Sequence, residues 1–346
     1  MSACRHFGSC GGCTHQDGSD YHALKRATVM AALARAGVEA QVEETRAVGE
    51  GSRRRAAFKL ARTNAGLEIG FHAARSHQIV DMGECLVLTP PLFALVEKLR
   101  ATLTGVMKEG EKAELHALES ETGFDLSIRM ERKLTPALTA AIAAVKLPAA
   151  RILFNGEILL ENASPRVSFD GIAVLPPPMA FLQATAEGEG VLREKVLAIT
   201  GGAKKVSDLF SGLGTVSLPL ARRAKVHAVE QDKDALAALA AAARVATGLK
   251  PVTTEKRDLF KLPLDALELN AYDAVVMDPP RAGAEAQARM LAASKVKRVA
   301  YVSCDAATFA RDARILIDGG YRIGVVTPVD QFLYSNHIEM VAGFTR

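Results

Sequence analysis

Tryptophan is absent from this sequence, cysteine occurs only 5 times in 346 residues, and no apolar run reaches the roughly 18 residues of a membrane-spanning helix. The first residues, MSACRHFGSCGGC, lack the apolar core of a secretory signal peptide. We therefore expect a cytoplasmic protein that does not associate with a membrane. A chain of this length is expected to form about two domains, and it buries enough surface to be stable without disulfides.

An excess of one charge is also missing. The 43 Lys and Arg residues against 39 Asp and Glu give a formal net charge of +4, which permits a polyanionic partner without indicating one. With 49% hydrophobic and 24% charged residues, the chain is too apolar to be disordered and too charged for a membrane bundle. The composition indicates a soluble globular protein, and nothing in it points to an obligate protein partner.

Three segments differ in their pattern of hydrophobic residues. Residues 1–85 combine a cysteine-rich loop, a helix over 21–36 and a meander of short antiparallel strands. Residues 86–175 show a mixed α+β pattern. The proline-rich LPPPM at 175–179 indicates a linker before the third segment, residues 180–346.

In residues 180–346 strand-like runs alternate with helical ones. Such alternation predicts βαβ units with right-handed crossovers and a doubly wound, Rossmann-like parallel sheet. The last two strand-like runs, 321–330 and 337–346, are joined by a short turn-like stretch. They are expected to form an antiparallel hairpin at the edge of this sheet.

A glycine-rich loop follows the first strand of this α/β segment. In SGLGTVSLPLA, Gly212 and Gly214 let the backbone pass close to a ligand at the start of a helix. A dinucleotide fingerprint needs a third glycine, and Ser217 occupies that position. The missing glycine argues against a nicotinamide oxidoreductase.

Acidic residues follow the next three strands. Glu230, Asp258 and Asp278 lie at the carboxyl ends, where the ligand site of an open α/β sheet is found, and Glu230 is placed to accept the hydroxyls of a ribose. Each alone is more typical of a helix cap. Together with the glycine loop, which carries no basic residue, they favour a neutral-to-cationic adenosine ligand. S-adenosylmethionine, with its sulfonium and amino groups, suits such a pocket better than NAD or ATP.

Four of the cysteines form one pattern. Cys4, Cys10 and Cys13 have C-x5-C-x2-C spacing, and Cys85 lies far downstream beside the strand meander. In a cytosolic protein, four such residues indicate a metal site rather than disulfides. Zinc and an iron–sulfur cluster are both chemically admissible, and the uneven spacing with a remote fourth ligand favours the cluster. Unrelated free thiols are the alternative.

The remaining cysteine, Cys304, ends a strand on the side of the sheet where Asp278 lies, and a helix is expected to begin directly after it. A lone cysteine is usually buried and inert, whereas a helix N-terminus can hold it as a nucleophilic thiolate. Methylation of carbon 5 of uracil requires a thiolate to add at carbon 6, and a base must then remove the carbon 5 proton. Glu339, in SNHIEMV, is a candidate base, although a carboxylate on an edge strand is more often solvated.

The motif DPPR, at 278–281, lacks two features that would indicate other methylation targets. Methyltransferases that act on exocyclic amines carry an aromatic residue at the fourth position, where this chain has Arg281. Cytosine-specific RNA enzymes generally carry a cysteine in the corresponding motif, and this motif has none. The motif therefore favours uracil.

These motifs resemble the RNA uracil-5-methyltransferases, especially their iron–sulfur-containing 23S ribosomal RNA branch, over essentially the whole chain. DLFSGLGTVSLPLA resembles the cofactor motif of that family, DAVVMDPPRAG its acidic-Pro-Pro-Arg motif, VAYVSCDAATFARD its nucleophile motif and SNHIEMV its base motif. GFHAARSHQIVDMGECLVL resembles the segment that carries the fourth cluster ligand.

The resemblance implies a class I methyltransferase domain at 180–346, a central RNA-binding domain at 86–175 and an iron–sulfur loop within 1–85. It implies Cys304 as the nucleophile and Glu339 as the proton acceptor. Beside Gly212 of the glycine loop, it implies contacts to S-adenosylmethionine at Gln183, Phe210, Thr215, Glu230, Asp258 and Asp278. A four-iron, four-sulfur (4Fe-4S) cluster would be held by Cys4, Cys10, Cys13 and Cys85.

The chain departs from the family pattern in several places. Many members begin with a small β-barrel (TRAM) RNA-binding domain, which this sequence lacks. Thr215 and Thr185 each stand where the family usually has Asn, and SCDAAT replaces S-C-N-P-x-T. The last change places Asp305 next to Cys304, where its charge is expected to raise the pKa of the thiol.

RNA is the expected partner. Five basic residues at the start of the meander form a stripe suited to phosphates, or else an ordinary solvated charge run: Arg53, Arg54, Arg55, Lys59 and Arg62. The target uridine must lie in a loop or be flipped out, because a thiolate cannot reach carbon 6 within a stacked helix. Ribosomal RNA is favoured over transfer RNA, since the transfer RNA branch generally lacks the four cysteines. A non-catalytic iron–sulfur RNA-binding or redox-sensing module would leave Cys304 and Glu339 unused.

Overall fold

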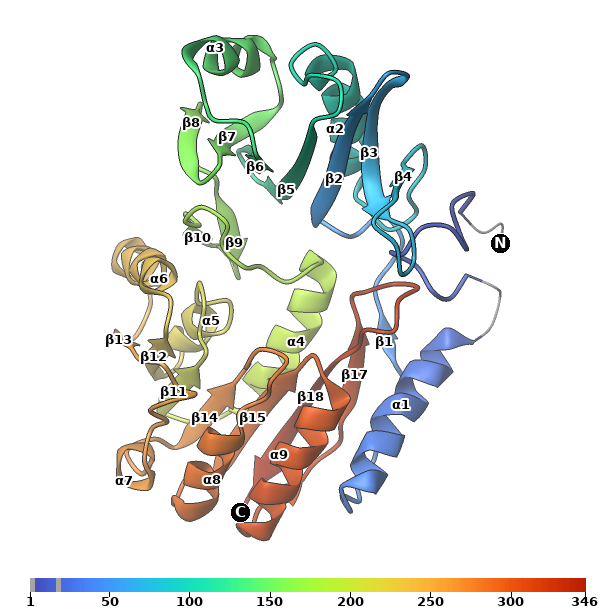
Figure 1. Ribbon diagram of the computed structural model, residues 1–346. Helices are drawn as coiled ribbons and strands as arrows, with labels where there is room; N and C mark the ends of the chain where they lie inside the picture. The colour runs from blue at the N-terminus through green and yellow to red at the C-terminus, as the bar shows by residue number, and fades with distance from the viewer. Residues whose placement is uncertain (1–3, 17–19) are drawn as a thin grey trace.

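The computed structural model describes residues 4–16 and 20–346, so 1–3 and 17–19 of the predicted N-terminal loop lie outside the described residues. Two bodies lie one above the other in Figure 1. The upper body is a seven-stranded sheet with α2 (Pro90–Leu103) and α3 (Pro136–Ala144). The lower body is a nine-stranded sheet with helices on both faces.

Eight strands of the lower sheet follow the order β1-β17-β18-β15-β14-β11-β12-β13, and β16 pairs with β18. The parallel core is β11 (Lys205–Leu209), β12 (Lys225–Glu230), β13 (Val252–Lys256), β14 (Ala274–Met277) and β15 (Arg298–Ser303). The other strands are β1 (Arg46–Ala47), β16 (Arg322–Ile323), β17 (Thr327–Asp330) and β18 (Glu339–Thr345). The predicted alternation of strands and helices around a parallel sheet is confirmed.

The last strand, β18, lies inside this sheet and not at its edge. It pairs antiparallel with β15 on one side and with β17 on the other, and β1 pairs with the far side of β17. The predicted antiparallel hairpin is therefore confirmed, but its expected position at the edge is wrong. After β15 and α9 (Ala306–Asp318) the chain passes over one strand position to form β17, and β18 returns to fill the gap.

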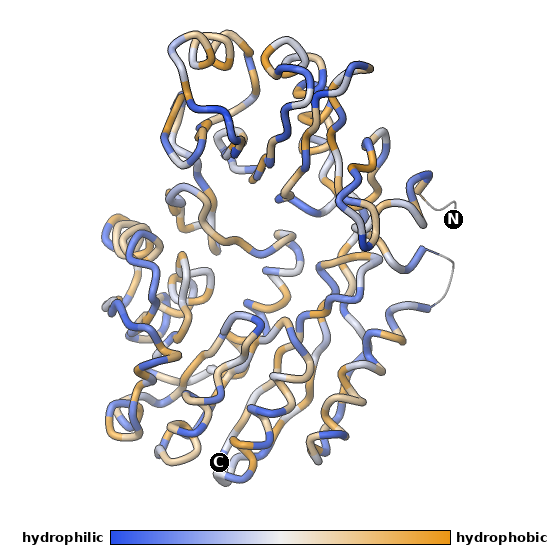
Figure 2. Tube along the Cα trace, in the orientation of Figure 1, coloured by the Kyte–Doolittle hydropathy of each residue, from blue (hydrophilic) through white to orange (hydrophobic). Residues whose placement is uncertain are grey.

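Helices cover both faces of the lower sheet (Figure 1). They are α1 (Tyr21–Arg35), α4 (Ala186–Ile199), α5 (Ser217–Ala221), α6 (Lys233–Val245), α7 (Ala266–Leu269), α8 (Glu285–Ala293) and α9. Asp20, Asp232 and Asp305 begin α1, α6 and α9, because each carboxylate accepts hydrogen bonds from N–H groups of the first turn. Figure 2 shows hydrophilic and hydrophobic residues alternating along α1 and α9, whose apolar sides share one core.

The upper sheet has the strand order β4-β3-β2-β5-β6-β7-β8. Its strands are β2 (Arg55–Thr63), β3 (Gly66–His72), β4 (Ile79–Asp81), β5 (Lys112–Ser120), β6 (Gly123–Met130), β7 (Ala149–Phe154) and β8 (Glu157–Glu161). The predicted meander is confirmed as β2, β3 and β4. It continues into β5 through the pairing of β2 with β5, so the expected boundary at residue 85 falls inside one sheet.

One face of the upper sheet is covered and the other is open. Phe58, Leu60 and Leu115 alternate along β2 and β5 and pack with residues of α2 in a buried core. The residues between them, such as Lys59 and Glu114, are only partly buried. An antiparallel sheet with a helix on one side keeps polar side chains on the other, and this open face leads toward the lower body.

A small antiparallel hairpin, β9 (Val167–Phe169) with β10 (Ile172–Val174), precedes the segment that joins the two bodies. The predicted linker at 175–179 lies in this segment, which has no helix or strand before α4. Within 4–16 and 20–346, no helix is both long and apolar enough to span a bilayer.

We expect the buried ion pair between β6 and β7 to contribute strongly to stability. Arg151 donates to both oxygens of Asp125, at 2.9 and 2.6 Å, and both side chains are almost fully buried. Asp125→Ala leaves the guanidinium unpaired and is expected to lower the free energy of unfolding by about 3–5 kcal/mol in urea denaturation. The control Glu121→Ala breaks an exposed pair with Arg166 and is expected to cost less than about 1 kcal/mol. Equal losses in the two variants would contradict this assignment.

Candidate active site

A cavity of about 430 Å³ lies at the carboxyl ends of β11, β12, β14 and β15. This edge of an open α/β sheet is where ligands bind. The predicted site residues that line it are Gln183, Phe210, Gly212, Thr215, Glu230, Asp278, Cys304 and Glu339. All of the predicted cofactor contacts except Asp258 therefore share one cavity with the predicted catalytic pair.

Asp258 does not line this cavity. Its Oδ1 accepts the N–H of Phe260 at 3.1 Å, and its Oδ2 lies 3.4 Å from Nζ of Lys261. The carboxylate thus stabilises the turn after β13, and the next two residues line the cavity in its place. The ring of Phe260 lies 5.5 Å from that of Phe210. No sequence motif distinguishes Phe260 from an aromatic residue of the core, so the sequence did not indicate it as a site residue.

The glycine loop folds around the carboxylate of Glu230. Gly212 N–H donates to Glu230 Oε2 at 3.0 Å, and the other oxygen accepts the N–H groups of Gln231 and Asp232 at 2.7 and 3.0 Å. Gly212 has φ +52° and Gly214 has φ +87°, and a Cβ on Gly214 would lie 2.8 Å from the side chain of Leu239. Both the turn and the close approach to α6 therefore require glycine.

Ser217, which follows the glycine loop, is hydrogen-bonded to the end of β11. Its hydroxyl donates to Asp208 Oδ2 at 2.5 Å, and Asp208 lines the cavity at the end of β11. Burial raises the pKa of Asp208 to about 7. The residue that departs from the dinucleotide fingerprint thus holds a buried carboxyl group beneath the cavity, which the motif spacing did not reveal.

Strand pairing brings Cys304 and Glu339 together. Ser303 of β15 pairs with Met340 of β18. The next residues, Cys304 and Glu339, therefore face each other at the end of the antiparallel pair. Glu339 is 4% exposed, because β18 has neighbours on both sides. The expectation that an edge-strand carboxylate is solvated does not apply.

Burial dominates the titration of this pair. It raises the pKa of Cys304 to about 11, with further contributions from the negative charges of Glu339 and Asp278. It raises the pKa of Glu339 to about 8, and Asp278 adds to that shift. Desolvation thus favours the neutral thiol of Cys304, and activation of Cys304 as a thiolate stays a prediction.

Asp305 acts on α9 and not on the thiol. Its Oδ1 accepts the N–H groups of Ala307 and Thr308, both at 3.0 Å. Two backbone donors thus hold the carboxylate at the helix N-terminus, where it caps α9. The expected effect of its charge on the pKa of Cys304 stays a prediction.

Gln331, which the sequence did not indicate, lies between Glu339 and Gln183. Gln331 is 1% exposed and donates to Gln183 Oε1 at 2.6 Å. Its hydrogen bond lowers the pKa of Glu339. Gln183 Nε2 in turn lies 3.5 Å from Asp278 Oδ2. The two amides thus link the carboxyl groups of Glu339 and Asp278. A glutamine directly after a strand has no special sequence signal, and only the fold shows its contacts.

The cysteine pattern forms a second, separate cavity. Cys4, Cys10, Cys13 and Cys85 line a space of about 150 Å³ beside Arg53. Burial raises the pKa of Cys13 to about 12, and the other three thiols add to the shift. Among the described residues, no three His, Cys, Asp or Glu side chains lie close enough to bind a single ion. The four cysteines therefore line one cavity, without the spacing of a single-ion site.

The predicted basic stripe does not form a continuous surface. Arg54 Nη2 lies 2.6 Å from Glu189 Oε2, Lys59 pairs with Glu114 at 2.8 Å, and Arg62 donates to the carbonyl groups of Thr104 and Thr63. Arg53 is turned to the cysteine cavity, and Arg55 is turned to Phe181. Alternation along β2 sends these side chains to opposite faces of the sheet.

Comparison with known sequences defines the class of protein. A family model described as tRNA (Uracil-5-)-methyltransferase matches residues 178–345. An RNA methyltransferase of Rhizobium meliloti (strain 1021), itself uncharacterized, is 47% identical over 98% of this chain and 84% of that protein. The 23S rRNA (uracil(1939)-C(5))-methyltransferase RlmD of Aeromonas salmonicida is 31% identical over 99% of this chain and 82% of that protein. These relatives and the site define an RNA methyltransferase.

The fold agrees with this class. The structure of a tRNA (uracil-54, C5)-methyltransferase from Pyrococcus abyssi, in complex with S-adenosyl-L-homocysteine, superposes with a TM-score of 0.76 and 24% identity, covering 97% of this chain and 85% of that one. The chain belongs to the RNA (uracil-5-)-methyltransferase family.

Gln331→Met is expected to raise the pKa of Glu339 above its value of about 8. Methionine has a similar shape but cannot donate the hydrogen bond that favours the carboxylate. The pKa is measured by carbon-detected NMR titration of glutamate-labelled protein, with Glu339→Gln used to assign the signal. The control Gln78→Met changes an exposed glutamine far from Glu339 and should leave the titration unchanged. A pKa that falls, or that shifts equally in both variants, would refute the role of Gln331.

Proposed function

We propose that this protein transfers the methyl group of S-adenosylmethionine to carbon 5 of a uridine in large-subunit ribosomal RNA. Cys304 is the nucleophile and Glu339 is the base. The observation that carries this proposal is the pairing of β15 with β18, which places a thiol and a buried carboxyl group face to face in one cavity. Uracil methylation at carbon 5 needs this combination of groups.

The opposite end of the cavity suits the methyl donor. Glu230 is held by three backbone N–H groups at the end of β12, where a carboxylate accepts both hydroxyls of a ribose. The rings of Phe210 and Phe260 provide apolar surfaces for an adenine, and Asp208 and Asp278 supply negative charge for the sulfonium and amino groups. Thr215 lies among them, so the change from Asn keeps a polar side chain in the cavity.

The reaction follows from the positions of the two catalytic residues. The Cys304 thiolate adds to carbon 6 of uracil, and the resulting enolate attacks the sulfonium methyl group from carbon 5. S-adenosylhomocysteine leaves with the electron pair of the broken S–C bond. Glu339 then accepts the proton from carbon 5, the C6–S bond breaks, and 5-methyluridine and the Cys304 thiolate are released.

The raised pKa values give this site a pH dependence. A base with a pKa of about 8 and a thiol with a pKa of about 11 are both protonated at lower pH. A sulfonium bound in the cavity would add positive charge and would favour the ionised forms of both groups. The rate of methyl transfer therefore rises with pH through the neutral range.

The four N-terminal cysteines would hold a 4Fe-4S cluster. Cys4, Cys10, Cys13 and Cys85 would be its ligands, and the cluster would cross-link the N-terminal loop to the segment after β4. The loop is also tied to the catalytic body, because the N–H groups of Thr14 and His15 both donate to the carbonyl of Tyr334. This position, away from Cys304, supports a structural role.

We propose ribosomal RNA, rather than transfer RNA, as the substrate. The 31% identical relative from Aeromonas salmonicida is named as a 23S rRNA enzyme, and its similarity extends over 99% of this chain. The Pyrococcus abyssi enzyme named for transfer RNA shares the fold at 24% identity. In either RNA the target uridine must leave its stack to reach Cys304.

Covalent trapping tests the chemistry. RNA with 5-fluorouridine at the target should form a stable adduct with the wild type and S-adenosylmethionine, because fluorine at carbon 5 cannot be removed as a proton. The adduct is detected by denaturing electrophoresis and located by peptide mass spectrometry. Cys304→Ala should form none, and Glu339→Gln should retain adducts even with ordinary uridine.

The matched control is Cys85→Ser, which keeps the thiol of Cys304. An adduct in Cys304→Ala would overturn the assignment of the nucleophile. Rapid release of methylated RNA by Glu339→Gln, at more than about 1% of the wild-type rate, would overturn the assignment of the base, since general base catalysis contributes about 10²–10⁴-fold.

The cluster is tested separately by metal analysis of anaerobically purified protein. We expect iron and acid-labile sulfide in equal amounts, with visible absorbance that Cys85→Ser loses and Cys304→Ser keeps. Bound zinc in place of iron, or full iron content in Cys85→Ser, would contradict the proposed cluster.

A further inference from the structure

Another cavity, of about 260 Å³ and distinct from the cysteine cavity, adjoins the active site. It has no part in the reaction described above. It lies between the open face of the upper sheet and the joining segment, and it shares Ala180 and Phe181 with the active-site cavity. Arg55, His116 and Ser127 form its sheet side. These residues come from neighbouring strands, because Ala57 pairs with His116 and His116 pairs with Ser127. We call this space the flanking cavity.

Two residues that line the flanking cavity carry buried polar atoms without a partner. Among the described residues, Ser127 Oγ and Arg55 Nε neither donate nor accept a hydrogen bond. Ser127 is 3% exposed, and an unsatisfied buried polar group costs about 1–3 kcal/mol. Rotation of either side chain would bring its polar atom to the cavity, where a ligand can supply the missing hydrogen bond.

The flanking cavity also carries positive charge that no ion pair neutralises. Arg55 forms no ion pair within the described part of the chain, and its guanidinium stacks on Phe181, 4.5 Å from the ring centre. Burial, together with Arg53 and Arg54, lowers the pKa of Arg55 to about 10, and the negative charge of Glu339 opposes that shift. Asp125 adds no net charge here, since it is paired with Arg151. An anion at Arg55 would relieve the cost of this buried cation.

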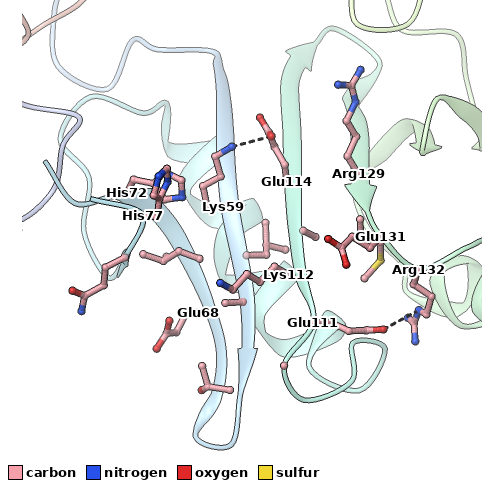
Figure 3. Close-up of a pocket in the computed structure, with 18 of the residues that line it drawn as sticks. Lys59, Glu68, His72, His77, Glu111, Lys112, Glu114, Arg129, Glu131 and Arg132 are labelled. Atoms are coloured by element: carbon pink, nitrogen blue, oxygen red, sulfur yellow. Dashed lines mark ion pairs between the residues drawn. The ribbon is translucent and has the colours of Figure 1, made fainter. Parts of the chain in front are cut away.

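The larger groove on the same sheet face differs in this respect. This groove, shown in Figure 3, has a volume of about 1370 Å³ and lies further from the active site. Two of its cations form ion pairs: Lys59 with Glu114 at 2.8 Å, and Arg132 with Glu111 at 3.3 Å. Lys112 and Arg129 form none within the described part of the chain, but Glu68 and Glu131 line the same groove. Its basic side chains are therefore matched in number by glutamates, so it gives no preference for a polyanion.

We propose that the flanking cavity binds one unstacked nucleotide of the substrate RNA, next to the target uridine. Its phosphate lies at Arg55, and its base enters the flanking cavity against Ser127 and His116. Phe181 is 67% exposed and separates this base from the target uridine. A cavity slightly smaller than a typical small-molecule site of about 300 Å³ admits one nucleotide and excludes a duplex. The proposal rests on the function proposed above.

The test is a binding cycle that combines a protein change with an RNA change. The probe is a synthetic hairpin of the ribosomal RNA segment around the mapped target, with a single abasic nucleotide at each position within two of that uridine. Kd is measured by fluorescence anisotropy for wild type and for Ser127→Leu, which fills the flanking cavity. Ser127→Ala, which only removes the hydroxyl, is measured alongside. Lys59→Gln, in the charge-balanced groove, is the matched control.

For the wild type we expect one abasic position to weaken binding by roughly 5- to 100-fold, the effect of losing one stacked base. Ser127→Leu should weaken binding of the intact hairpin to a similar extent and become insensitive to that one position. Ser127→Ala should show a smaller loss of the same kind, and Lys59→Gln should respond as the wild type does. If Ser127→Leu does not fold by thermal denaturation, Ser127→Ala and Arg55→Lys decide the question.

The proposal would be overturned if each abasic position weakened binding equally in the wild type and in both Ser127 variants. It would also be overturned if both variants bound the intact hairpin as tightly as the wild type does. Methyl transfer by the wild type is recorded in the same samples. If methyl transfer is normal but the expected binding pattern is missing, only the proposal that the flanking cavity binds a nucleotide is refuted. The expected pattern without transfer supports the cavity and refutes the proposed reaction.

Discussion

The antiparallel pairing of β18 with β15 and β17 is the constraint on which the site depends. It places Glu339 opposite Cys304 at the end of the strand pair and buries the Glu339 carboxyl group, while Cys304 stays partly exposed. Burial raises the pKa of the carboxyl group to about 8, which is close to the value that suits a general base near neutral pH. Strand register and burial therefore account for the position of this pair and for the raised pKa of Glu339.

The remaining parts of the molecule supply what the pair needs. The glycine loop and Glu230 form the end of the cavity proposed for the methyl donor, while Gln331 and Gln183 link Glu339 to Asp278. The cysteine loop is hydrogen-bonded to the β17–β18 connection at Tyr334, so its order is coupled to the segment that leads into Glu339. The open face of the upper sheet completes the surroundings at Arg55. RNA would therefore be held between the two bodies, with its reactive base in the lower one.

Motifs with fixed chemistry could be predicted from the sequence, and contacts set by topology could not. The alternation of strands and helices, the glycine loop and the convergence of Cys4, Cys10, Cys13 and Cys85 depend on local patterns and spacing. The interior position of β18 depends on a skipped strand position, which no periodicity records. Asp258 has the sequence context of Glu230 and a similar local hydrogen bond, yet only Glu230 lines the cavity. Gln331 and Ser127 look like ordinary polar residues, and only tertiary packing shows that they are buried.

The central claim is tested most directly by deleting the gene in its own organism and mapping 5-methyluridine in purified RNA fractions by nucleoside and fragment mass spectrometry. The account predicts that 5-methyluridine disappears from a defined position of the large-subunit ribosomal RNA and returns with the wild-type gene but not with Cys304→Ala. Loss from transfer RNA alone would contradict the proposed substrate. Unchanged 5-methyluridine in every fraction would contradict the proposed reaction.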